Sequence, residues 1–102
     1  MSITNYKINE ALCILQEECA EVIQVVSKIY RFGAENRWPF TGSPRNVDRL
    51  EEELGDLLAM MEILVDEGLI RREKIQLASH RKKLKLKEFS KHLGKTVDKL
   101  TS

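Results

Sequence analysis

Residues that interrupt helices are scarce in this chain. Only 2 prolines and 5 glycines occur among its 102 residues, and these are the residues that most disfavour a helix interior. The chain also lacks an apolar run long enough to span a membrane, and its N-terminus lacks a basic-then-apolar leader. We therefore expect neither a membrane protein nor an exported one, but a cytoplasmic helical domain.

Cysteine and histidine are equally scarce, which limits the metal chemistry available. On one helix Cys13 and Cys19 would lie about 9 Å apart along the axis, too far for a disulfide, and no Cys/His cluster suggests zinc. A di-iron bundle needs Glu-x-x-His on two helices, but apolar residues stand three positions before His80 and His92. We expect two reduced, half-buried thiols and no di-iron site.

Charged and apolar side chains are abundant instead, at 32% and 42% of the chain. The length predicts one domain over residues 1–102, and a chain this small would gain stability from association. Residues 1–67 contain 6 Lys/Arg and 13 Asp/Glu, a balance of −7, whereas residues 68–102 contain 11 and 3, a balance of +8. The two parts could serve a site that binds metal cations and anions, or they could be solvated faces that pair with each other.

Apolar residues recur at steps of three and four, which is the spacing of amphipathic helices. The pattern predicts helices over about residues 5–31, from Ser43 or Asn46 to about Asp66, from Arg71 through Leu84, and over about residues 89–93. Between the first two lies an unusually long loop, "FGAENRWPFTGSPRN". The predicted fold is all-α, a short helical bundle with two long acidic helices that is completed by oligomerisation.

The first helix contains carboxylates whose helical phase separates them. With Ile8 as zero and about 100° per residue, Glu18 falls near −80° and Glu21 near −140°, on an arc shared with apolar residues. Glu17 falls near 180°, on the polar side. We therefore expect Glu18 and Glu21 along the flank of the core and Glu17 in solvent.

The second helix repeats this arrangement. With Leu50 as zero, Glu53 falls near −60° and Asp56 near −120°, again on an apolar arc. Carboxylates drawn together out of water repel one another and lose hydration, so such a cluster shares protons or binds a cation. Oxygen ligands without imidazole or thiolate select a hard ion, Mg²⁺ or Mn²⁺ before zinc.

The two acidic patterns, "EECAEVIQ" and "LEEELGDLLAMM", resemble those of the MazG-like all-α nucleoside triphosphate pyrophosphohydrolases. The resemblance covers the first two helices and their connection. It implies cleavage of a nucleoside triphosphate, often a deoxynucleotide, to monophosphate and pyrophosphate, with Mg²⁺, in a homodimer or homotetramer. It also implies a supporting role at most for Glu17 and a set of metal ligands made of Glu18, Glu21, Glu53 and Asp56.

The triphosphate of such a substrate would need cations, because the chain has no glycine-rich phosphate loop. The candidates are Lys28, Arg31, Arg81, Lys82 and Lys85. Trp38 could stack on a base, although a Trp in a loop more often packs against its own domain or a neighbouring subunit. A lysine-rich run such as "HRKKLKLKEFSK" is most often a solvated face.

Two other function classes are open on the residues alone. The chain could be a non-catalytic helical interaction module whose acidic arc docks a basic partner, such as the C-terminal segment of a second copy. Nucleic-acid binding through the basic tail is weakened by the near-neutral net charge of +1 and by the few aromatics among the Lys/Arg residues. Dependence on a metal ion discriminates between the enzyme and the module.

Overall fold

The computed structural model describes residues 5–102, and this part of the chain is all-α, as predicted. It forms α1 (Tyr6–Phe32), α2 (Asn46–Asp66), α3 (Arg72–Phe89) and α4 (Gly94–Thr101). The helices belong to two compact units, the first ending at Leu69 and the second spanning Ile70–Ser102. None of the helices in residues 5–102 combines the length and the apolar character needed to cross a bilayer.

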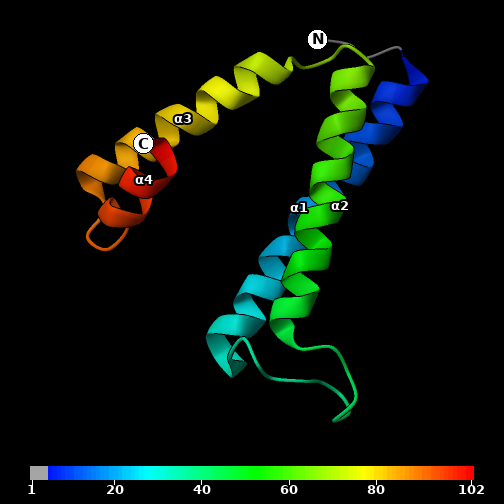
Figure 1. Cartoon of the computed structure of the whole chain (residues 1–102). Helices are drawn as coiled ribbons and strands as arrows, with labels where there is room; N and C mark the ends of the chain where they lie inside the picture. Colours follow the sequence, from blue (N-terminus) through cyan, green and yellow to red (C-terminus); the bar gives the residue numbers. More distant parts are fainter. Residues whose placement is uncertain (1–4) are drawn as a thin grey trace. The chain divides into compact units, whose positions relative to one another are not determined.

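In the first unit, α1 and α2 lie side by side as an antiparallel pair (Figure 1). The side chain of Asn5 begins α1 by accepting hydrogen bonds from the backbone N–H groups of Lys7 and Ile8, at 2.9 and 3.2 Å. Gly33 ends the helix with a φ of 94°, a conformation that favours glycine. Its N–H donates to the Ile29 carbonyl at 2.8 Å.

The second helix begins at Asn46, one of the two starting points expected from the sequence. The residue before the helix is Arg45, whose backbone N–H donates to the Asp48 carboxylate at 3.0 Å. Neither Ser43 nor Asn46 caps this helix. Ser43 uses its hydroxyl to accept from the Phe40 N–H, and the buried Asn46 side chain donates to the Gly33 carbonyl at 3.0 Å.

The loop between the two helices is held by hydrogen bonds that connect distant residues. The N–H groups of Asn46 and Val47 donate to the carbonyls of Asn36 and Ala34, at 2.9 and 3.0 Å. The Arg45 guanidinium binds Glu35 at 2.9 Å and Asp48 at 2.8 Å. These bonds fix the path of residues 33–45 against the first turn of α2.

The core of this unit is small. Its buried apolar residues are Ala11, Val25, Met60 and Leu64, the last of them only 1% exposed. Several large apolar side chains of the same two helices remain exposed, among them Ile23 at 70% and Leu58 at 53%. Cys13 and Cys19 are also exposed and free, not half-buried as expected. A pair of helices has only one shared face, so their other apolar positions stay accessible to solvent.

In the second unit, α3 and α4 pack against each other, and Lys87 binds Asp98 at 2.8 Å (Figure 1). The fourth helix was misplaced by the sequence reasoning. Phe89 is the last residue of α3, and α4 begins at Gly94, after the end of the range expected for the fourth helix. The hydroxyl of Ser90 accepts from the Leu93 N–H at 3.1 Å, which stabilises a turn where the sequence pattern suggested a helix.

Candidate metal centre

Carboxylates from both long helices meet midway along the first unit. Glu18 comes from α1, and Glu53 and Asp56 come from α2. One oxygen from each of these three lies within 4.8 Å of the others. The i, i+3 spacing places Glu53 and Asp56 on one helix face, and the antiparallel pairing brings that face to Glu18.

Two atoms of this cluster are buried without a hydrogen-bond donor. They are Oε2 of Glu18 and Oε2 of Glu53, and both residues are half-buried. A buried ionised carboxylate oxygen with no partner is costly. A proton or a cation between the carboxylates would remove that cost, so these atoms fit a group that is not part of the chain.

The protonation of Glu53 reflects the same crowding. A hydrogen bond with the Glu21 carboxyl raises the pKa of Glu53 to about 7, and burial and the charges of Glu21, Glu18 and Asp56 act in the same direction. Burial also raises the pKa of Glu18, with the charges of Asp56 and Glu21 adding to the effect. Without a cation, the cluster therefore loses this proton only near neutral pH.

The two other predicted carboxylates, Glu21 and Glu17, are not among the three that converge. Glu21 is exposed and is not one of the three whose oxygens converge, but it contacts Glu53 closely enough to perturb its titration. Glu17 is exposed, on the side of α1 expected from its phase. The donor set is made only of carboxylate oxygens, which suits a hard cation such as Mg²⁺ or Mn²⁺.

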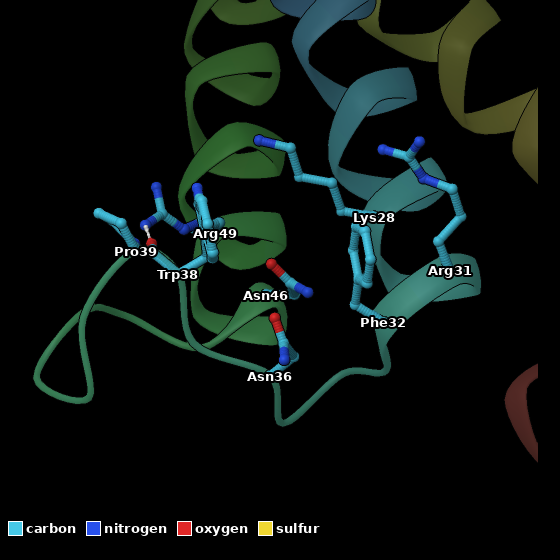
Figure 2. Close-up of a pocket in the computed structure, with 8 residues that line it drawn as sticks. All are labelled: Lys28, Arg31, Phe32, Asn36, Trp38, Pro39, Asn46 and Arg49. Atoms are coloured by element: carbon cyan, nitrogen blue, oxygen red, sulfur yellow. Dashed lines mark hydrogen bonds between the residues drawn. The ribbon is translucent and has the colours of Figure 1, made fainter.

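A pocket of about 740 Å³ opens at the end of the same helix pair where the loop joins α1 to α2 (Figure 2). It has three cationic side chains and no carboxylate in its lining. The lining residues are Lys28, Arg31, Phe32, Asn36, Trp38, Pro39, Asn46 and Arg49. The site therefore changes from acidic to basic along the helix pair.

Sequence reasoning named three of these lining residues, Lys28, Arg31 and Trp38, and missed the other five. Arg49 could have been found, because it stands one helical turn before Glu53 and so shares its face. Asn36 and Phe32 carried no such signal, since their positions depend on the path of the loop. The other predicted cations, Arg81, Lys82 and Lys85, are exposed residues of α3 in the second unit.

These features define a class of protein, an all-α domain whose long helices build an oxygen-only acidic centre beside a basic pocket. The family is more specific. The chain belongs to the MazG nucleotide pyrophosphohydrolase domain family, whose model matches residues 7–100. The resemblance seen in the sequence is thereby confirmed, and it extends over nearly the whole chain. Comparisons with curated proteins and with solved structures found no match.

Proposed function

We propose that this protein is a Mg²⁺-dependent nucleoside triphosphate pyrophosphohydrolase that converts a (d)NTP and water to a (d)NMP and pyrophosphate. The observation that carries the proposal is the pair of buried carboxylate oxygens, on Glu18 and Glu53, that lack any donor. Membership of the MazG nucleotide pyrophosphohydrolase family supplies the reaction class. Mn²⁺ is the alternative cation for the same donor set.

In the proposed reaction the oxygen of water bonds to the α-phosphorus. The bond from that phosphorus to the α,β-bridging oxygen breaks, pyrophosphate leaves with its electron pair, and the water proton is lost to solvent or a carboxylate. When bound, the cation would neutralise phosphate oxygens and lower the pKa of the attacking water. Glu18, Glu53 and Asp56 would hold it, with Glu21 as the fourth carboxylate.

The other predicted residues receive lesser roles. Glu17 is exposed and is not one of the three converging carboxylates, so we assign it at most the orientation of a water molecule or of a neighbouring ligand. Lys28 and Arg31 line the basic pocket and would stabilise negative charge on the phosphates. Arg81, Lys82 and Lys85 belong to the second unit and stay predicted phosphate contacts of lower rank.

The assembly is also a proposal. The first unit leaves large apolar side chains exposed on α1 and α2, including Ile23, Leu54 and Leu58. We propose that a second copy of the chain covers them, in a homodimer or homotetramer. Light scattering of the wild type and of Leu58→Asp tests this: the variant should lower the oligomeric state while leaving the far-ultraviolet circular dichroism unchanged. A wild type that is monomeric at high concentration would refute the proposal.

Domain organisation and cellular location are part of the same proposal. The family match spans both compact units, which supports one functional domain over the whole chain. The two exposed free cysteines fit a reducing compartment, and we propose a cytoplasmic location on that basis.

The deciding experiment is a product assay. Purified protein is incubated with each common NTP and dNTP, with Mg²⁺ or with EDTA, and the phosphate-containing products are separated. Monophosphate with pyrophosphate, lost in EDTA, is the expected result. Diphosphate with phosphate would overturn the site of attack. Absence of turnover together with the absence of Mg²⁺ binding would favour the interaction module.

The matched variants are Glu53→Gln and Glu52→Gln. Glu53 lies in the cluster, and its neighbour Glu52 is exposed on the same helix. Glu53→Gln should abolish turnover, because it removes a metal ligand. Its helical content should stay intact, because the change also relieves repulsion between the carboxylates. The second should leave turnover unchanged. Equal activity of the two variants would show that the carboxylate cluster has no role in the reaction.

A further inference from the structure

The basic pocket contains two aromatic rings that are exposed and yet held in place. Phe32 at the end of α1 is 57% exposed, and Trp38 in the loop is 71% exposed. In Figure 2 they lie on opposite sides of the pocket, with the amides of Asn36 and Asn46 between them. We call the space between the two rings the aromatic slot.

Each of the two aromatic residues of the slot has an arginine in contact with it. Arg49 donates from Nη2 to the Trp38 carbonyl at 2.8 Å, a bond that fixes the backbone that carries the ring. The guanidinium carbon of Arg31 lies 5.0 Å from the centroid of the Phe32 ring. Phe32 nevertheless remains 57% exposed, so part of its ring surface is accessible to a ligand. Exposed rings held in this way suit a planar partner that stacks on them.

The two asparagines of the slot differ in their hydrogen bonds. Asn46 is buried, and its amide already donates to the Gly33 carbonyl at 3.0 Å. The backbone of Asn36 is fixed, because its carbonyl accepts from the Asn46 N–H at 2.9 Å. Its side-chain amide makes no hydrogen bond to any residue in the described part of the chain. Asn36 can therefore offer one acceptor and two donors to a ligand edge.

Residues that line the pocket lie one to two helical turns from the carboxylates along α1 and α2. Arg49 precedes Glu53 by one turn of α2, about 6 Å along the axis, and Lys28 follows Glu21 by two turns of α1, about 10.5 Å. Lys28 forms no ion pair within residues 5–102. A ligand that reaches from the carboxylates to the slot would pass Lys28. The positive charge of Lys28 suits a ligand that carries a negatively charged group between its ring and the end at the carboxylates.

We infer that the aromatic slot binds the nucleobase of the substrate and that Asn36 recognises the edge of that base. The inference rests on the proposed function, since it places the α-phosphate at the carboxylates and the ring about two helical turns away. Phe32 and Trp38 supply stacking, which tolerates every base, and the Asn36 amide supplies the discrimination between bases. Arg49 is a positioning residue, because it acts through Trp38.

A direct test uses the single tryptophan of the chain as a probe. Trp38 fluorescence is recorded in EDTA while the protein is titrated with each dNMP and, separately, with 2-deoxyribose 5-phosphate. Saturable quenching by the nucleotides but not by the sugar phosphate is expected, because only the base can stack. Equal quenching by both, or no quenching by either, would overturn the inference. The measurement requires neither turnover nor metal, so it can succeed even where the proposed reaction fails.

Variants of the loop give the second test. Trp38→Ala should raise the KM for the preferred dNTP about tenfold with little change in kcat, and Trp38→Phe should restore most of the loss. Phe40→Ala is the matched control, since Phe40 lies two residues away, is 74% exposed and does not line the pocket. An equal effect of Phe40→Ala and Trp38→Ala would refute the slot.

Asn36→Ala addresses recognition of the base edge. It should reduce the spread of kcat/KM values across the four dNTPs, because the lost contacts differ from base to base. A uniform fall for all four substrates would mean that Asn36 does not read the base. Retained Trp38 quenching in this variant shows that the slot itself is intact.

Discussion

Proton release from Glu53 is the most quantitative expectation from the acidic centre. The pKa of Glu53 is raised from 4.5 to about 7 by the hydrogen bond with Glu21, by burial and by the neighbouring carboxylates. A cation binds the carboxylate form, so binding must displace this proton. We therefore expect Mg²⁺ binding, measured without nucleotide, to weaken as the pH falls.

The magnitude follows from that pKa. One site titrating at about 7 carries about 0.9 proton at pH 6, about 0.5 at pH 7 and about 0.1 at pH 8, and these are the protons released per cation bound. The apparent Kd should rise about tenfold between pH 8 and pH 6. In the cation-free protein the same shift lowers stability as the pH rises from 4.5 to about 7, because the folded state holds the proton more tightly than the unfolded state.

Isothermal titration calorimetry in two buffers of different ionisation enthalpy measures the released protons directly. Glu17→Gln is the matched control, because Glu17 is exposed and lies outside the cluster, so this variant should keep both affinity and proton release. Glu53→Gln should lose the proton release and bind Mg²⁺ more weakly. An apparent Kd that does not change between pH 6 and pH 8, with no proton released, would refute the reasoning.

Three further outcomes are expected. Glu18→Gln should lower kcat/KM at least about a hundredfold and Glu17→Gln less than about tenfold in the product assay, and equal losses would contradict the phase argument. Asn46→Ala should lower the free energy of unfolding by about 1–3 kcal/mol in urea, since it removes the donor to the Gly33 carbonyl, whereas Asn36→Ala should change it by less than about 0.5 kcal/mol. Leu64→Ala should cost about 2–5 kcal/mol in the same measurement, and a smaller loss would mean that this buried site collapses around the cavity.

Local periodicity predicted the long helices well, because each helix repeats its apolar spacing over many turns. The first was expected over about residues 5–31 and is Tyr6–Phe32, and the second was expected to end at about Asp66 and does. The predicted position of the fourth helix was wrong. Since α4 is only 8 residues long, its sequence shows no sustained apolar period. There the hydrogen bond from Leu93 to Ser90, which a periodicity argument does not consider, decides the boundary.

The sequence alone determined which carboxylates share a helix face, because the phase of a regular helix depends only on spacing. It therefore placed Glu53 and Asp56 together and Glu17 apart, whereas their chemical roles remain predictions. The tertiary structure alone decided which oxygens converge across the two helices and where the loop runs. The pocket depends on hydrogen bonds between residues ten or more positions apart, such as those of Asn46 with Asn36 and Gly33. Spacing along one chain segment carries no information about such contacts, because they form only when α1 and α2 pack together.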